Sequence, residues 1–230
     1  MTVPEAPRDI VVIPDLHGRL DALEAMLRAT GFVDAQGRLK DSPLWLVQLG
    51  DLLDRGPHPR ACVQRMMDLQ AQAPDRVHVV RGNHEEMALN AADPTVRRMW
   101  LINGGPSTLA DYEGEFEAWL QPGGKHYQWL KSLPLYFEYK DVLFCHAGLA
   151  KGRKGKLHAE GLMWDRPPLE KGAYRAVVCG HTVTASGGVE ESRGVWSCDI
   201  GLGHHRTDTA LQVLVLTVGD VVLSPKVISI

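Results

Sequence analysis

The sequence predicts an α/β fold, built in layers from helices and mixed sheets. The first half of the chain alternates short apolar runs rich in β-branched residues with segments of helical periodicity, whereas the second half consists mainly of strand-like runs. A length of 230 residues suits one α/β domain with a well-developed core, and no repeat period divides the chain. We therefore expect a single domain over residues 1–230, with residues 1–8 as a flexible N-terminal tail.

The N-terminal half predicts three buried strands, each followed by a helix. The strands are expected at Ile10–Ile13, Leu44–Leu49 and Val77–Val80. The first helix carries Leu20, Leu23, Met26 and Leu27 at helical spacing and stops at Gly31. Later helices are expected to open at Pro57, near Glu85 and at the Asp93-Pro94 cap.

The rest of the chain predicts a helical region and then a series of strands. Residues 95–132 read as helical segments interrupted by glycine, and the character changes after Leu133-Pro134. Strands are then expected at Tyr136–Tyr139, Val142–Cys145, Arg175–Cys179, Val195–Ile200, Leu211–Leu216 and Val221–Val227.

Composition excludes several classes of protein. Lysine plus arginine number 25 against 28 for aspartate plus glutamate, and the net charge of −3 argues against a general nucleic-acid binder. The first ten residues contain no apolar signal region, and the longest apolar stretch, Ala210–Val218, is too short to span a bilayer. The four cysteines lack metal-binding spacing, so a reducing, cytoplasmic setting is predicted, and Cys145, Cys179 and Cys198 are expected to be small buried apolar residues.

Polar clusters follow five of the expected strands. They are Asp15-Leu16-His17-Gly18, Gly50-Asp51-Leu52-Leu53-Asp54-Arg55-Gly56, Arg81-Gly82-Asn83-His84-Glu85, His146-Ala147-Gly148 and Gly180-His181-Thr182. In open α/β sheets, ligands bind outside the carboxyl ends of the strands, so these clusters are expected to converge on one crevice. Asp15 and His17 are two residues apart, hence on the same side of an extended chain and able to hold one ion together.

The chemistry of these residues points to divalent cations. Two carboxylates, one amide oxygen and three imidazoles suit Mn, Fe or Zn rather than Cu(I) or an iron–sulfur cluster. Six such side chains are too many for one open catalytic ion and suit two ions that share a carboxylate.

The five ordered motifs resemble those of the calcineurin-like metallophosphoesterases, and more narrowly those of the phosphoprotein phosphatases and their bacterial diadenosine tetraphosphate hydrolase relatives. The resemblance covers Ile10 to Leu216. It implies an α/β/β/α sandwich with two mixed sheets. Pro14-Asp15 replaces the family's usual Gly-Asp, from which we expect a slightly altered turn and no loss of metal binding.

The resemblance also implies a role for each site residue. One ion would be held by Asp15, His17 and Asp51, and a second by Asp51, Asn83, His146 and His181. The ions are expected to be Mn²⁺, with Fe or Zn as alternatives. His84 resembles the general acid and Asp54 the carboxylate that orients it, while Arg55 and Arg166 resemble clamps for phosphate.

The implied function is hydrolysis of phosphomonoesters, on phosphoserine or phosphothreonine of proteins, by direct attack of a metal-bridging hydroxide. The Asn-His-Glu-Glu-Met continuation and the Asn103-Gly104-Gly105 segment after Trp100 resemble bacterial Ser/Thr protein phosphatases. The alternative is hydrolysis of dinucleoside polyphosphates, as in a bis(5'-nucleosyl)-tetraphosphatase, and a further alternative is a scaffold that has lost catalysis.

Some residues keep two interpretations. His58, His78, His126 and His158 are expected to be structural, whereas His204 and His205 are open between a structural role and a contact with substrate. The basic Lys151–Lys156 segment reads as a solvated loop that could also attract a phosphorylated substrate. The oligomeric state is not indicated.

Overall fold

The computed structural model of the protein describes residues 9–113, 124–151, 157–204, 210–219 and 223–230. The expected tail over residues 1–8, His205 and residues 152–156 of the basic loop lie outside this part of the chain.

The first sheet is formed by the three N-terminal strands and the last two of the chain. Its order is β10-β9-β1-β2-β3. The bounds are Ile10–Ile13 for β1, Trp45–Gln48 for β2, Val77–Val79 for β3, Gln212–Val218 for β9 and Leu223–Ser229 for β10. Strands β1, β2 and β3 are parallel, while β9 is antiparallel to both β1 and β10.

The second sheet has the order β4-β5-β6-β8-β7. The bounds are Tyr136–Tyr139 for β4, Val142–Cys145 for β5, Ala176–Cys179 for β6, Glu190–Ser192 for β7 and Val195–Ser197 for β8. Strands β5, β6 and β8 are parallel, and antiparallel strands close both edges. Both sheets are therefore mixed, as predicted.

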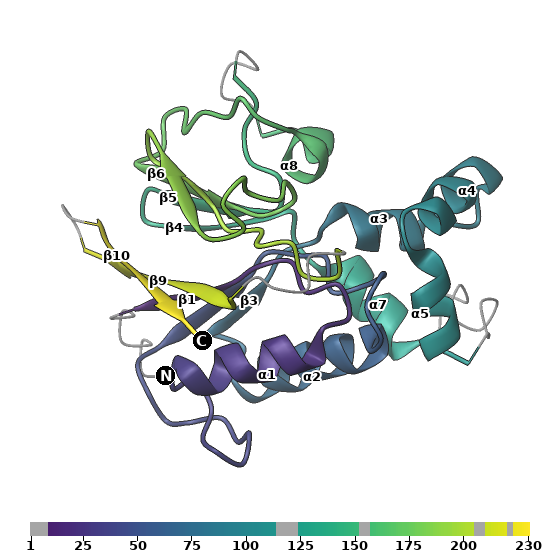
Figure 1. Ribbon diagram of the computed structural model, residues 1–230, viewed down its shortest axis with the longest axis horizontal. Coiled ribbons are helices and arrows are strands. Elements are labelled where there is room, and N and C mark those ends of the chain that lie inside the picture. The colour runs from purple at the N-terminus through teal and green to yellow at the C-terminus, as the bar shows by residue number, and fades with distance from the viewer. Residues whose placement is uncertain (1–8, 114–123, 152–156, 205–209, 220–222) are drawn as a thin grey trace.

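The helices fall into three groups. Helices α1 (Leu20–Ala29) and α2 (Pro59–Gln72) lie under the first sheet, and α8 (Ala159–Trp164) lies above the second. The remaining helices gather at one side of the molecule in Figure 1: α3 (Asn83–Leu89), α4 (Pro94–Ile102), α5 (Gly105–Asp111) and α7 (Lys125–Ser132). The predicted cap of α4 is confirmed, because the Asp93 carboxylate accepts the backbone N–H groups of Thr95 and Val96.

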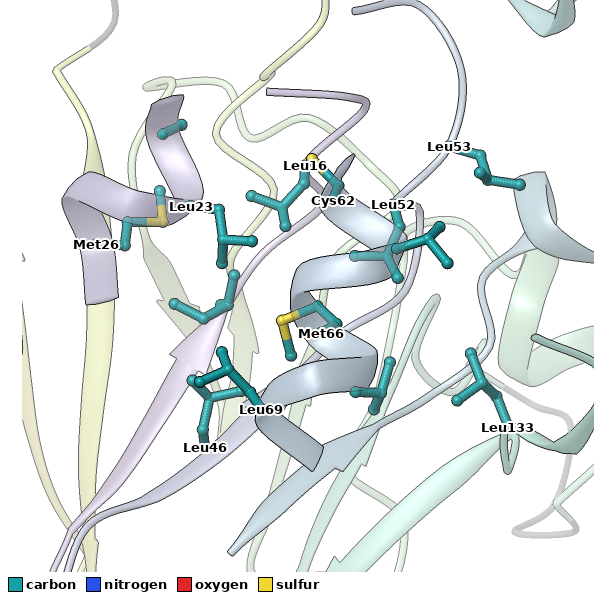
Figure 2. Packing of buried hydrophobic residues seen from close by; sticks show 14 of the residues in the cluster. Leu16, Leu23, Met26, Leu46, Leu52, Leu53, Cys62, Met66, Leu69 and Leu133 are labelled. Atoms are coloured by element: carbon teal, nitrogen blue, oxygen red, sulfur yellow. The ribbon is translucent and has the colours of Figure 1, made fainter. Parts of the chain in front are cut away.

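Figure 1 shows these elements arranged as the predicted α/β/β/α sandwich. Three clusters of buried apolar side chains join its layers. Val11 and Ile13 face the helices, where α1 and α2 pack with Leu23, Met26 and Met66 (Figure 2). The alternate residues of β1 face the second sheet, and a separate cluster lies between that sheet and α8. Both faces of the central strands β1, β5 and β6 are thus buried, which explains why these strands read as continuous apolar runs.

Several boundaries differ from the prediction. Helix α2 begins at Pro59, because His58 precedes it as the N-cap, and α3 begins at Asn83 rather than near Glu85. The strand expected to reach Ile200 ends at Ser197, because its pairing with β6 and β7 stops at that residue. Helix α8 and strand β7 were not predicted. None of the helices in the described part of the chain combines the length and apolarity needed to span a bilayer.

Candidate active site

The five polar clusters meet at one edge of the sandwich because the strands that precede them are parallel. In the first sheet Ile13 pairs with Gln48 and Gln48 with Val79, so the chains leave β1, β2 and β3 side by side. In the second sheet Phe144 pairs with Val178, which brings the ends of β5 and β6 together. The carboxyl ends of both sets deliver their polar residues to a common place.

Leucines between the polar residues anchor the first two motifs. Leu16, Leu52 and Leu53 are fully buried in the layer between the helices and the first sheet (Figure 2). The backbone N–H groups of Leu16 and His17 both donate to the carbonyl of Asp51, at 3.0 and 2.8 Å. These contacts fix the two motifs to each other.

The site holds its residues in an unusual backbone conformation. His17, Asp51, Asp54, Arg55 and His181 all have positive φ, between 44° and 70°. The left-handed region costs a non-glycine residue about 1–2 kcal/mol. Such strain persists only where surrounding contacts enforce it, which is typical of functional sites.

Two sets of ligand atoms share the Asp51 carboxylate. Its Oδ2 lies 3.6 Å from His17 Nε2 and 3.8 Å from His84 Nε2, while its Oδ1 lies 3.5 Å from His146 Nε2. Within the described residues, His17, Asp51 and His84 form one group able to hold a cation, and Asp15, Asp51 and His146 form another. Asp51 is the residue common to both.

The second set extends to the amide of Asn83. The Oδ1 atom of Asn83 lies 2.8 Å from His146 Nε2 and 2.9 Å from His181 Nδ1. The structure therefore brings together all six side chains for which metal binding was expected: Asp15, His17, Asp51, Asn83, His146 and His181. By proximity, Asp15 groups with His146, whereas the resemblance paired it with His17.

The hydrogen bonds of the histidines show that these residues fit a cation. His17 and His146 each donate Nδ1–H to a backbone carbonyl, of Leu53 at 2.9 Å and of Leu49 at 2.8 Å, which leaves both Nε2 lone pairs inside the site. Burial lowers the pKa of His146, so its Nε2 carries no proton for Asn83 Oδ1. Two acceptors thus face each other at 2.8 Å, an arrangement that a cation satisfies.

The charges in the site lead to the same conclusion. Burial raises the pKa of Asp15 well above its usual range, and the negative charges of Asp199 and Asp51 raise it further. Burial also opposes ionisation of Asp51, whereas protonation of the surrounding imidazoles, His146 first, lowers the pKa of this carboxyl. Asp15 Oδ1 and His181 Nε2 are buried atoms for which the described residues provide no hydrogen-bond partner. A bound cation would stabilise both carboxylates as anions.

His84 and Asp54 form a buried pair beside this site. His84 Nδ1 donates to Asp54 Oδ2 at 2.6 Å, and the backbone N–H of His84 donates to Asp51 Oδ1 at 3.0 Å. Burial alone would lower the pKa of His84, but the carboxylates of Asp51 and Asp54 outweigh it and raise the pKa. The pair therefore favours an imidazolium whose Nε2 proton points into the site.

The two arginines expected to bind phosphate also lie at this edge. Arg55 Nη1 lies 2.6 Å from His17 Nε2, and its Nη2 lies 3.1 Å from His84 Nε2. Arg166 is exposed, with Nη1 3.5 Å from the hydroxyl of Thr182, and its positive charge helps to lower the pKa of His181 to about 3, after burial and His146. A guanidinium at this position can pair with two phosphate oxygens at once.

Of the two histidines left open, His204 lies among the described residues. His204 Nε2 lies 2.5 Å from Arg55 Nη1, and its ring lies 5.9 Å from that of His17, so this residue belongs to the site. Of the histidines expected to be structural, His78 stacks on Phe137, His126 bonds to Tyr112 and Gln64, and His58 and His158 directly precede α2 and α8. The expectation that Cys145, Cys179 and Cys198 are buried is confirmed, and Cys62 is buried as well.

Sequence reasoning missed four residues of the site. Glu85 is fully buried and accepts backbone N–H groups of the second motif, and Asp199 lies buried beside Asp15. Trp100 and Thr108 donate hydrogen bonds to Asp54. A signal was present for Glu85 in the Asn83-His84-Glu85 motif, whereas Trp100 and Thr108 follow no pattern that distinguishes them from core residues.

Ligand sets that share one carboxylate and lie beside arginine are characteristic of metal-dependent hydrolases of phosphate esters, and the fold and the site define that class. Comparison with known proteins specifies the family. Residues 8–185 match the calcineurin-like phosphoesterases, and the chain belongs to this family. It is a hydrolase with candidate ligands for divalent cations at the strand ends.

Individual relatives differ in how much of their length is matched. The chain is 30% identical to serine/threonine-protein phosphatase 1 of Salmonella typhimurium over 191 residues, which cover 71% of this chain and 81% of the relative. It is 26% identical to the symmetrical bis(5'-nucleosyl)-tetraphosphatase of Vibrio campbellii over 140 residues, which cover 60% of this chain and 44% of the relative. A solved structure described as a cold-active protein tyrosine phosphatase matches with a TM-score of 0.75 at 19% identity, over 97% of this chain and 78% of that one. This match confirms the predicted fold.

Proposed function

We propose that the protein is a phosphatase that depends on two divalent cations and hydrolyses phosphomonoesters, with phosphoserine and phosphothreonine on proteins as its substrates. One observation carries the proposal: the Asp51 carboxylate is common to two groups of ligand atoms, with Oδ2 facing His17 and Oδ1 facing His146. A shared carboxylate is what a pair of closely spaced cations requires. Manganese is the proposed metal, because carboxylate, amide and imidazole ligands suit it.

Asp15, His17 and Asp51 would hold one cation, and Asp51, Asn83, His146 and His181 the other. When bound, the cations supply Lewis-acid activation of water and neutralise charge on the phosphoryl group. Arg55 and Arg166 orient the phosphoryl oxygens through their guanidinium N–H groups. His84 donates its Nε2 proton to the departing alkoxide oxygen, and Asp54 stabilises the imidazolium before the transfer. The acid is needed because a serine or threonine alkoxide is a poor leaving group.

The choice of substrate rests on the relatives. The protein-phosphatase relative from Salmonella is matched over 81% of its length and the tetraphosphatase from Vibrio over 44% of its length. Both chemistries transfer a phosphoryl group to water, so the site alone does not separate them. The Vibrio relative supports dinucleoside polyphosphate hydrolysis as the second candidate.

A substrate comparison on the manganese-loaded protein tests the proposal. We expect turnover of phosphoserine and phosphothreonine peptides to exceed that of diadenosine tetraphosphate, and to be lost on chelation. A large excess on the dinucleotide would establish the second candidate. A phosphotyrosine peptide of the same sequence belongs in the panel, because the solved relative is described as a tyrosine phosphatase. Failure to hydrolyse any phosphoester with any divalent metal would support a scaffold.

Two further expectations remain part of the proposal. One domain over residues 1–230 is supported by the continuous core that joins β1 and β9, from opposite ends of the chain. A reducing, cytoplasmic setting is supported by the four buried free thiols.

A further inference from the structure

We propose that Thr108 and Trp100 are positioning residues for the general acid. They lie on the helical hairpin formed by α4 and α5, and they hold both the backbone and the carboxylate of Asp54 in the arrangement that His84 requires. The inference rests on the proposed role of His84 as the acid.

Asp54 and Arg55 form a strained pair that needs external support. Their φ angles are 70° and 67°, so two consecutive residues with side chains adopt the left-handed conformation. This conformation is unfavourable for residues other than glycine. Without contacts to enforce it, the pair would relax, and both the acid's carboxylate partner and the phosphate-binding guanidinium would move.

The hairpin provides a partner for each of the two strained amides. The backbone N–H of Asp54 donates to the hydroxyl of Thr108 at 3.0 Å, and that of Arg55 donates to the carbonyl of Gly104 at 3.3 Å. Gly104 has a φ of 117°, and a Cβ there would lie 2.7 Å from Cγ of Arg55. The turn between the helices must therefore be glycine to approach this closely.

The same hairpin fixes the carboxylate. The Thr108 hydroxyl donates to Asp54 Oδ1 at 2.6 Å, and the indole N–H of Trp100 spans both oxygens at 3.0 and 2.9 Å. His84 Nδ1 donates to the other oxygen of Asp54, Oδ2, at 2.6 Å. Asp54 and Trp100 are fully buried and Thr108 is 1% exposed, so water does not compete for these bonds.

Thr108 has a role that an apolar residue cannot fill. Its hydroxyl accepts from the backbone of Asp54 and donates to the side chain of the same residue. Trp100, Gly104 and Thr108 are spaced four residues apart, so one short segment contributes all three contacts.

The alternative is that Trp100 and Thr108 only pack the core. That alternative predicts an equal loss of activity on all substrates. A positioning role predicts a loss that grows as the leaving group worsens, because only a poor leaving group needs the acid.

The test compares kcat/KM for phenyl phosphate and 2,4-dinitrophenyl phosphate on the manganese-loaded protein. Thr108→Val removes the hydroxyl at nearly constant shape, and Thr108→Ser retains it. We expect Thr108→Val to lose about tenfold or more on phenyl phosphate and about threefold or less on the dinitrophenyl ester, within the range general acids contribute. Thr108→Ser should retain most of the wild-type kcat/KM on phenyl phosphate. Trp100→Phe should show the same selectivity, and it decides the question if Thr108→Val does not fold.

Trp129→Phe is the matched control. It removes an indole N–H that donates to Gln70 at 2.8 Å, on α7 and away from Asp54. This variant should change kcat/KM equally for both substrates, or leave it unchanged for both. His84→Asn separates the two levels of the proposal. If kcat/KM falls more on phenyl phosphate than on the dinitrophenyl ester for His84→Asn but not for Thr108→Val and Trp100→Phe, the positioning inference is wrong and the acid assignment stands. If His84→Asn itself lowers kcat/KM equally on both substrates, the acid assignment is wrong, and the positioning inference is then wrong as well.

Discussion

A carboxylate oxygen of Glu85 accepts the backbone N–H of Asp51 at 2.8 Å. The same side chain also accepts the N–H groups of Leu52 and Gly82, at 2.8 and 2.9 Å. The residue directly after the proposed acid thus holds the turn that presents Asp51, the proposed shared ligand. Burial, followed by the negative charge of Asp51, raises the pKa of Glu85 to about 7.

Replacing this carboxylate should therefore loosen the metal site as well as the fold. Glu85→Gln puts an amide NH₂ against backbone donors, and we expect the free energy of unfolding to fall by about 1–3 kcal/mol. The affinity for Mn²⁺ should fall as well. Metal titration measures the affinity, and urea unfolding measures the free energy of unfolding. Glu86→Gln is the neighbouring control, because Glu86 forms a partly exposed ion pair with Arg81 whose loss costs under about 1 kcal/mol. Equal effects from both variants would contradict the role given to Glu85.

The sequence was sufficient to predict where the proposed metal ligands lie, for a physical reason. Asp15, His146 and His181 each lie within two residues of a strand's end. Parallel pairing then brings those ends to one edge whatever the details of the helices. The α/β/β/α layering could also be predicted, because both faces of β1 are apolar and each must be covered by another layer.

The support around the acid could not be predicted, because it depends on how distant helices pack. Trp100 and Thr108 contact Asp54 across 46 and 54 residues of sequence. Strand β7, Glu190–Ser192, lacks the apolar alternation of a strand and forms only because it pairs with β8. Local sequence patterns carry no information about such contacts.

Asp51→Asn should deplete both cations. The amide removes the negative charge that both ligand groups share, and its NH₂ cannot act as a ligand. His181→Asn should weaken only the site that contains Asn83, from which we expect about half the metal content. Metal analysis of the purified variants measures both. A single ion retained by Asp51→Asn would show that the carboxylate is not shared.

His84→Asn should keep its metal and lose turnover. His84 is not among the residues proposed to hold either cation, and it contributes a proton, so kcat should fall about 10²–10⁴-fold on a phosphoserine peptide. Metal analysis of the same preparation is the control. Wild-type turnover in this variant would show that the acid assignment is wrong.

Asp199 should make the metal-free protein less stable as the pH rises. Its Oδ1 accepts the backbone N–H of Gly201 at 2.9 Å, whereas its buried Oδ2 has no partner among the described residues. Burial raises its pKa to about 6, and the negative charge of Asp51 adds to this. A carboxyl with a raised folded pKa stabilises the folded state below its unfolded pKa of about 4, and that contribution is lost as the pH rises through 6.

Asp199→Asn removes this titration and tests it. The buried amide carries its own cost, but that cost does not vary with pH, so the difference between variant and wild type is informative. We expect the free energy of unfolding of the variant, relative to wild type, to rise by about 2–3 kcal/mol between pH 4 and pH 7.5. The change should be larger still if Asp15 contributes, because the charge of Asp199 also raises the pKa of Asp15. Urea unfolding in the presence of a chelator measures it, and a difference that stays constant across this range would show that Asp199 does not titrate there.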